Sequence, residues 1–234
     1  VTVADANGCS ASDDVIVNVY TSAPVNAGID TNTCSGNPII LTASGGNNYV
    51  WSTGETLASI SVVPQTNTTY TVSVSDNNGC SGTDDVIVTV NPNPSISISP
   101  QSANICIGDS ITIIASGGTT YNWSPSQGLS NTNISNPVAY PANNTTYIVT
   151  TFNQFGCSST ASINITVEPY PILTITPNTA TICEGETANI TASGASTYIW
   201  YPSTGLTNTN GANTIASPTQ TTTYTLTGTS SNGC

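Results

Sequence analysis

Seven cysteines are the side chains of this sequence best suited to covalent chemistry, and they recur at regular intervals. Spacings of 25 or 26 residues alternate with spacings of 46 or 51 residues. Four of these cysteines end a turn-like Gly-Cys dipeptide, and three precede a strand-like run. Because the chain has no histidine and no Cys-x-x-Cys pair, the pattern predicts disulfides rather than a metal centre. The positions are Cys9, Cys34, Cys80, Cys106, Cys157, Cys183 and Cys234.

Other chemistry is narrowly limited, because the 234 residues include no Lys, Arg, His or Met. A chain without basic side chains cannot neutralise phosphates, which excludes nucleic-acid binding and attraction to an anionic membrane. The commonest general base and the amine nucleophile are also missing. No apolar run approaches the ~20 residues of a membrane span. We therefore expect no enzyme activity, no cofactor and no membrane insertion.

One cluster of oxygen-bearing side chains is a candidate for weak calcium binding. Asp76, Asn78, Asp84 and Asp85 surround a single turn, and an equivalent set follows Asp5. Carboxylate and amide oxygens at this density suit Ca²⁺. The later repeats have serines instead and no EF-hand spacing occurs, so the alternative is a solvated turn. The acids are equally uneven as a catalytic pair.

The cysteines belong to a longer repeated pattern that includes aromatic residues. A Tyr-x-Trp motif ends 17 residues after each cysteine of the second kind, and a Thr-Thr-Tyr motif follows later in each repeat. A tryptophan on a central strand packs in a sandwich core more readily than it serves as a sugar platform. We therefore expect six aromatic residues to lie in cores: Trp51, Trp123, Trp200, Tyr70, Tyr147 and Tyr224.

Between these landmarks apolar and polar residues alternate, as they do in half-buried strands. Short strands are expected at 95–99, 110–115, 121–123, 137–140, 145–151 and 161–167. Six or seven strands in about 70–100 residues is the size of an immunoglobulin-type sandwich. The sequence thus predicts an all-β fold of tandem immunoglobulin-like repeats in a head-to-tail array, cut from a longer one. The expected divisions are the last strands of a preceding repeat in 1–21, complete repeats in 22–91 and 92–168, and a repeat without its last strand in 169–234.

The combined motifs resemble a known class of repeat. Cys-x-Gly, Tyr-x-Trp, Thr-Thr-Tyr-x-Val, Asp-x-Asn-Gly-Cys and Val-x-Val together are similar to the PKD-like and Ig-like repeats of Bacteroidota surface proteins. Those proteins include gliding-motility adhesins and other cargo of the type IX secretion system. The resemblance covers the whole chain and implies export to the cell surface. Asp109-Ser110-Ile111 also resembles a short O-glycosylation motif of that phylum, which makes Ser110 a candidate glycosylation site.

Two disulfide connectivities are open. The A–B and F–G turns of an immunoglobulin-like sandwich lie at opposite ends, about 30 Å apart along a nine-residue strand, whereas a disulfide needs Cα atoms within about 7 Å. This favours bonds between successive repeats, Cys34–Cys157 and Cys106–Cys234. Pairing within one repeat, such as Cys34 with Cys80, is the alternative. In the favoured scheme neighbours beyond the segment would bind the other three: Cys9, Cys80 and Cys183.

Two functions follow from this organisation. The first is a structural or adhesive stalk or filament of a secreted surface protein, whose partners are neighbouring repeats of the same chain and other copies in a filament. The alternative is a module that binds a surface polysaccharide or another surface. It would need aromatic residues outside the cores, and the candidates are Tyr140, Phe155 and Tyr201.

Overall fold

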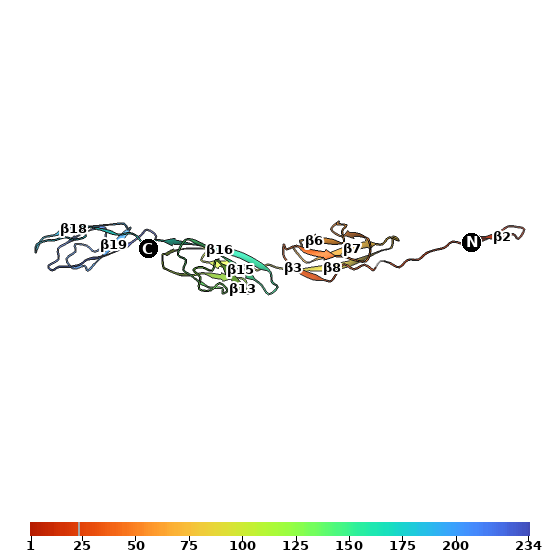
Figure 1. Ribbon diagram of the computed structural model, residues 1–234, viewed down its shortest axis with the longest axis horizontal. Helices are drawn as coiled ribbons and strands as arrows, with labels where there is room; N and C mark the ends of the chain where they lie inside the picture. Colours follow the sequence, from red (N-terminus) through yellow and green to blue (C-terminus); the bar gives the residue numbers. More distant parts are fainter. Residues whose placement is uncertain (23) are drawn as a thin grey trace. The chain divides into compact units, whose positions relative to one another are not determined.

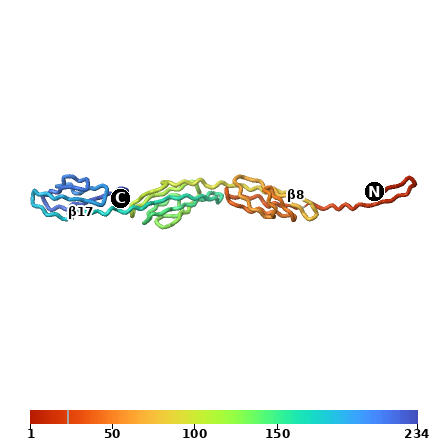
Figure 2. The backbone as a smooth tube through the Cα atoms, turned by 90° about the horizontal axis from the view of Figure 1, so that it is seen from above, coloured from red at the N-terminus to blue at the C-terminus, as the bar shows by residue number. Residues whose placement is uncertain are grey.

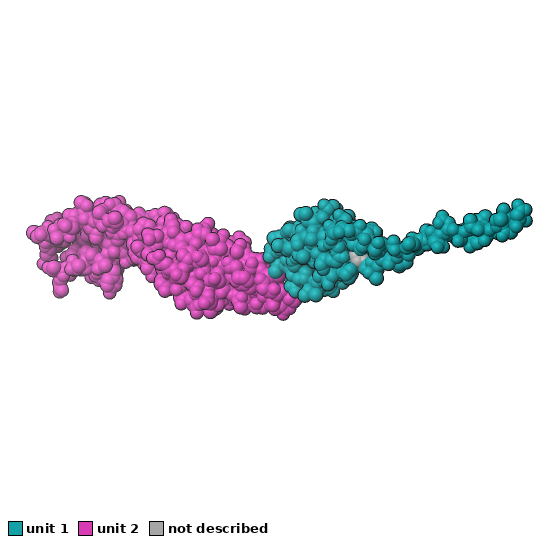
Figure 3. All heavy atoms as spheres, turned by 45° about the vertical axis from the view of Figure 1, so that its right-hand side comes forward, with its two compact units in different colours: residues 1–93 teal, residues 94–234 magenta. Residues whose placement is uncertain are grey.

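The computed structural model describes residues 1–22 and 24–234, which form strands and turns with no helix among them (Figure 1). The chain divides into two compact units, residues 1–93 and residues 94–234 (Figure 3). The first unit contains one β-sandwich, here named the first repeat. The second unit contains two, named the second repeat (residues 94–168) and the third repeat (residues 169–234). Each repeat has its own apolar core, and the expected all-β fold of tandem immunoglobulin-like sandwiches is confirmed.

The second repeat is a complete two-layer sandwich. Its larger sheet has the order β10-β16-β15-β13, in which β10 runs parallel to β16 and the other pairs are antiparallel. In the opposite layer β9 pairs with β12, and β11 pairs with β14. These layers correspond to strands A′, G, F and C on one side and A, B and E on the other. The bounds are β9 Ser97–Ser99, β10 Ser102–Cys106, β11 Ile111–Thr112, β12 Ile114–Ser116, β13 Thr120–Ser124, β14 Val138–Ala139, β15 Thr145–Phe152 and β16 Ser158–Glu168.

The first repeat has the same arrangement. Its larger sheet has the order β3-β8-β7-β5, with β3 parallel to β8, and the opposite layer pairs β4 with β6. A single bridge between Asn26 and Ser44 replaces the A–B pairing. The bounds are β3 Thr31–Cys34, β4 Ile39–Thr42, β5 Asn48–Trp51, β6 Ser59–Val62, β7 Thr68–Ser75 and β8 Ser81–Asn91.

The third repeat is built on fewer strands. One sheet has the order β17-β18-β20, which corresponds to A, B and E, and the other pairs β19 with β21, which corresponds to C and F. Within the described part of this repeat no strand corresponds to A′ or G. The bounds are β17 Thr174–Thr176, β18 Ala188–Ser193, β19 Thr197–Tyr201, β20 Asn213–Ala216 and β21 Thr225–Thr229.

A short hairpin begins the chain. The strands β1 (Thr2–Ala4) and β2 (Ser10–Ser12) pair in antiparallel register, and residues 13–22 continue outside any strand (Figure 2). All side chains of residues 1–22 are exposed. This segment therefore buries nothing in any of the three cores.

Alternation along each strand places the apolar side chains inside. In β16, Ile163 and Ile165 are buried, whereas Asn164 between them faces solvent. Trp51, Trp123 and Trp200 lie in the three cores, and each indole N–H donates to a backbone carbonyl at 2.9–3.1 Å. Two of the three expected tyrosines, Tyr70 and Tyr147, are buried, and the third, Tyr224, is half-buried against the core of the third repeat.

Strand A′ is the element that the sequence pattern did not predict. Residues 102–106 were expected to lie in an A–B turn, but they form β10 beside the end of β16, with Ile105 opposite Val167. The alternation of Ala103 and Ile105 with polar neighbours is the local signal, and it is too short to distinguish a strand from a turn. The expected strand B at 110–115 is divided into β11 and β12, which pair with different partners.

Candidate functional site

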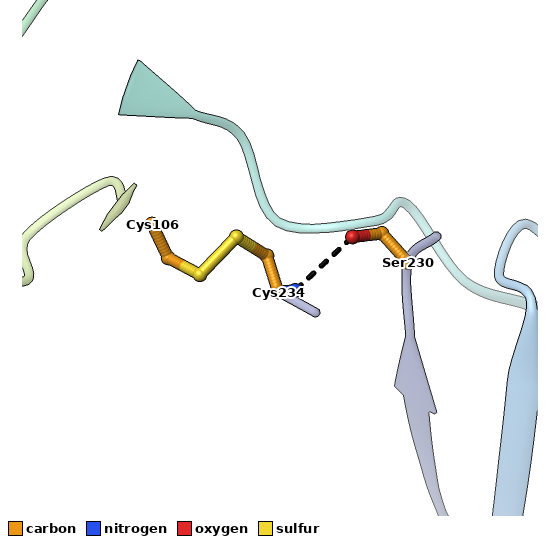
Figure 4. The surroundings of a disulfide bond; sticks show 3 residues. All are labelled: Cys106, Ser230 and Cys234. Atoms are coloured by element: carbon orange, nitrogen blue, oxygen red, sulfur yellow. Dashed lines mark hydrogen bonds between the residues drawn. A yellow bond between two sulfur atoms is a disulfide. The ribbon is translucent and has the colours of Figure 1, made fainter. Parts of the chain in front are cut away.

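A disulfide joins the second repeat to the third (Figure 4). Cys106 is the last residue of β10, and Cys234 follows β21 at the end of the F–G turn. Their Cα atoms lie 5.5 Å apart although 128 residues separate them in sequence, and 5.5 Å is an ordinary spacing for a disulfide. The bond therefore closes a loop that contains most of both sandwiches.

A hydrogen-bonded turn presents the cysteine at the F–G end. The backbone N–H of Cys234 donates to the Ser230 hydroxyl at 3.1 Å, and the Ser230 N–H donates back to the Cys234 carbonyl at 2.6 Å (Figure 4). Gly233 has a φ of 89°, a conformation that favours glycine. The turn thus fixes the direction in which the cysteine side chain leaves the third repeat.

The same turn recurs before the other cysteines of this kind, with an Asp or Asn in place of Ser230. The Asp76 carboxylate accepts from the N–H of Cys80 at 2.9 Å, and the Asn153 amide oxygen accepts from the N–H of Cys157 at 3.0 Å. Such side chains stabilise turns by accepting backbone hydrogen bonds. Sequence reasoning missed this role, although the signal was present as a short polar residue four positions before each Gly-Cys cysteine.

The register explains why the two cysteines of one repeat do not bond to each other. Cys34 lies opposite Asn91 at the end of β8, whereas Cys80 directly precedes Ser81 at its beginning. The eleven residues of β8 span about 35 Å, far beyond the reach of a disulfide. Cys34 is in fact disulfide-bonded and so is Cys157, whereas the described Cys9, Cys80 and Cys183 are free thiols.

The acids considered for calcium have structural partners. Besides holding the turn at Cys80, the Asp76 carboxylate accepts from the N–H of Asn78 at 2.9 Å. The Asp84 carboxylate accepts from the N–H of Ala27 at 2.8 Å, while Asp85 follows it on the opposite face of β8. Among the described residues no group of three Cys, Asp or Glu side chains lies close enough to hold a metal. Weak calcium binding stays a prediction, and the turn hydrogen bonds give these residues a role without it.

The aromatic side chains considered for ligand binding are exposed but separate. Tyr140, Phe155 and Tyr201 are all more than half exposed. Tyr140 precedes β15 and Phe155 follows it, so the eight residues of that strand place them about 26 Å apart at opposite ends of the second repeat. Tyr201 belongs to the third repeat. The structure thus gives these three residues no shared platform. The candidate glycosylation residue Ser110 is exposed just before β11.

A buried phenol is the described group whose titration is most clearly linked to packing. Burial raises the pKa of Tyr147 above its ordinary value, and the nearby Tyr140 phenol raises it further. The Tyr147 hydroxyl donates to the Gln127 carbonyl at 2.8 Å. Burial also raises the pKa of Tyr224, whose hydroxyl donates to the Thr204 carbonyl at 2.7 Å. Both phenols therefore stay neutral and hold loops, and neither is poised for proton transfer at neutral pH.

Comparison with known proteins relates this chain to tandem immunoglobulin domains in solved structures. It is 12% identical to titin domains I67–I69, covering 88% of this chain and 93% of that one, with a TM-score of 0.39. It is 14% identical to three domains of the outer capsid protein Hoc of bacteriophage RB49, covering 85% and 86%, with a TM-score of 0.37. It is 11% identical to domains 1–5 of Sidekick-1, covering 99% of this chain and 63% of that one, with a TM-score of 0.33.

These likenesses are similarities of architecture and carry no argument about ligands or partners. No family model matches the sequence, and no curated protein matches it. No helix among the described residues has the length and apolar character needed to cross a membrane. The fold assignment rests on the sheets and registers described above, and function has to be argued from the disulfide and its surroundings.

Proposed function

We propose that this chain is a structural and adhesive stalk segment of a large exported bacterial surface protein, in which disulfides between successive repeats carry tension. The observation that supports this most directly is the Cys106–Cys234 bond between two sandwiches. A disulfide inside one sandwich would stabilise that domain alone. A disulfide between sandwiches joins domains that would otherwise be connected by a short peptide linker.

The same connectivity extends to the first repeat. Cys34 ends β3 as Cys106 ends β10, and Cys157 follows Asn153 as Cys234 follows Ser230. Both Cys34 and Cys157 are disulfide-bonded. We therefore assign a Cys34–Cys157 bond, so that each A′ strand is joined to the F–G turn of the following repeat.

Such bonds change how the chain extends under force. A pull on the ends of the second unit passes through residues 94–106 and then through the disulfide to Cys234. The 128 residues of separation, about 450 Å of extended chain at about 3.5 Å per residue, stay outside the force path. The repeats therefore resist extension even if their sheets open.

The surroundings of the chain follow from the same features. Disulfides persist in oxidising compartments, which supports an extracellular location at the cell surface. The repeated motifs support a Bacteroidota protein of the gliding-adhesin type exported by type IX secretion. The lack of His, Lys and Arg supports a structural rather than a catalytic role.

A disulfide map of the oxidised protein tests the connectivity. Digestion with chymotrypsin and Glu-C under non-reducing conditions should yield peptides that link Cys106 to Cys234 and Cys34 to Cys157. Peptides that link Cys34 to Cys80 would overturn the proposal.

Single-molecule stretching tests the mechanical role. The oxidised chain should release about 450 Å less contour length from the second unit than the Cys106→Ser variant releases. The Cys183→Ser variant removes a free, exposed thiol and is the matched control. Equal contour lengths for the oxidised chain and the Cys106→Ser variant would show that the bond carries no tension.

A further inference from the structure

The third repeat has an open groove where the other two repeats hold strand G. In the second repeat, β16 lies between β15 and β10 and covers one side of the core. The equivalent space in the third repeat is a groove of about 580 Å³. Its lining includes Ala180, Ile182, Ile190, Trp200, Thr222 and Tyr224. Core side chains of the third repeat thus face this groove instead of a strand.

The backbone beside the groove is also unpaired where strand G would bind. Residues 180–183 correspond to β10 but form no strand, because their parallel partner is missing. Strand β21 begins at Thr225, whereas its counterpart β15 begins at Thr145, which corresponds to Thr222 at the offset of 77 residues between the two repeats. Two edges with free backbone groups are what an added β-strand needs.

The N-terminal segment of the chain has the sequence of a strand G without a sandwich to enter. Residues 13–19 match residues 84–90 of β8 at six of seven positions, with Asn18 in place of Thr89. In β8 the residues Val86 and Val88 are fully buried. Their counterparts Val15 and Val17 are 83% and 75% exposed, and Val19 is 88% exposed. Three valines on one face of a strand are thus left in solvent.

We infer that residues 13–19 of one copy insert into the groove of the third repeat of a second copy, as its strand G. The inference deepens the proposed function, because it names the partner through which stalk segments join end to end. The registers of the second repeat fix the pairing. Val15 of the donor would lie opposite Tyr224 and Val19 opposite Ile182, as Ile163 lies opposite Tyr147 and Val167 opposite Ile105.

The free cysteines fit this joining without further assumption. Each A′ cysteine is assigned to the F–G cysteine of the next repeat, and the repeat that follows a donated strand is the first repeat of the donor copy. Cys183 of the acceptor would therefore bond to Cys80 of the donor. Both are free thiols in the structure of the single chain. End-to-end joining would thus be sealed by an intermolecular Cys80–Cys183 disulfide.

Self-association of the full 234-residue chain tests the inference. The average mass measured by light scattering should rise with protein concentration. The Val17→Asp variant places a charge in the apolar groove and should associate at least about 10-fold more weakly. The Ile16→Asp variant is the matched control, since its counterpart Ile87 faces outward in β8 and both side chains are exposed in the single chain. Neither residue belongs to a core, so both variants should fold normally.

A mixture of isotope-labelled and unlabelled copies tests the seal. Non-reducing peptide mapping should find Cys80–Cys183 peptides that contain one labelled and one unlabelled half. A chain that stays monomeric at all concentrations would overturn the inference, as would equal association of the two variants. Protection of residues 180–183 from hydrogen exchange in a monomer would show that the chain's own strand fills the groove, which also overturns it. The Cys106–Cys234 peptide is read in the same map, so failure of the proposed stalk function is recognised separately.

Discussion

The second and third repeats contain the same landmarks at an offset of 77 residues, yet only the second is a closed sandwich. Ile113 is fully buried in the second repeat, whereas its counterpart Ile190 is half-buried beside the groove. Strand A′ forms in the second repeat, whereas the equivalent residues 180–183 form no strand. The one large difference between the two is strand G, which pairs with both A′ and F.

This difference shows which parts of the sandwich depend on long-range pairing. Strands B, C and E form in both repeats, because they pair with each other or with F and bury one face of a shared core. Strand A′ and the first three residues of strand F depend on G, and they are not in strands where G is missing. The cysteine at the end of A′ is therefore positioned by strand G of its own repeat.

The largest expected effect is the removal of the bond that couples the two repeats. Closing a loop of 128 residues stabilises the folded state by about 4–5 kcal/mol in the chain-entropy model, which is an upper value for a real disulfide. The double variant Cys106→Ser/Cys234→Ser should lower the free energy of unfolding by up to that amount. The third repeat should become the first to unfold, because it lacks strand G. Urea denaturation checks the total, and the Cys183→Ser variant should match the unsubstituted chain.

The next effect compares equivalent core residues in the closed and the open repeat. Ile113→Ala should cost about 3 kcal/mol, because the cavity it leaves is enclosed on all sides. Ile190→Ala should cost about half as much, because that side chain already borders the groove and water can fill the space. Native-state hydrogen exchange measures the free energy of opening in each repeat separately. Equal losses at the two positions would mean that the groove is filled in solution.

Much of this fold could be predicted from the sequence, because its strong signals are local. The alternation in Ile163 and Ile165 and the position of Trp123 depend only on neighbouring residues, and they locate strands and core. Strand A′ could not be predicted, because β10 is stabilised by a parallel partner about 60 residues away in sequence. The role of Asp76 was misjudged for a related reason. A cluster of carboxylates suggests a cation, whereas the partners of Asp76 are backbone N–H groups of its own turn.

A third prediction concerns a pair of residues whose sizes are exchanged between the two repeats. The second repeat has Gly118 beside Thr151, and the third has Ala195 beside Gly228 at the equivalent positions. A Cβ atom on Gly118 would overlap the Thr151 hydroxyl, and a Cβ on Gly228 would lie 2.8 Å from the Ala195 Cβ. Each repeat therefore has room for one side chain at this place.

The exchange can be tested by a double-mutant cycle. Gly118→Ala alone should destabilise the second repeat by about 1–3 kcal/mol through overpacking. Adding Thr151→Gly should recover part of that loss, which gives a coupling energy of about 1 kcal/mol. Recovery stays incomplete, because Thr151 also donates a hydrogen bond to the Thr120 carbonyl at 2.9 Å. Additive effects of the two substitutions would contradict the steric explanation.

The smallest expected effect is the loss of a single phenol hydrogen bond. Tyr147→Phe should lower the free energy of unfolding by about 1 kcal/mol at neutral pH, because the Gln127 carbonyl loses its donor. The pKa of Tyr147 is raised in the folded state, so the folded chain holds this proton more tightly than the unfolded chain does. The stability it contributes is therefore complete below pH ~10 and is lost as the pH rises through the higher folded value. Urea denaturation between pH 8 and pH 11 should show a shallower alkaline decline for Tyr147→Phe than for the control Tyr201→Phe, whose side chain is exposed. Tyr224 has a raised pKa from burial alone, without a neighbouring phenol, so Tyr224→Phe should flatten the alkaline decline less than Tyr147→Phe does.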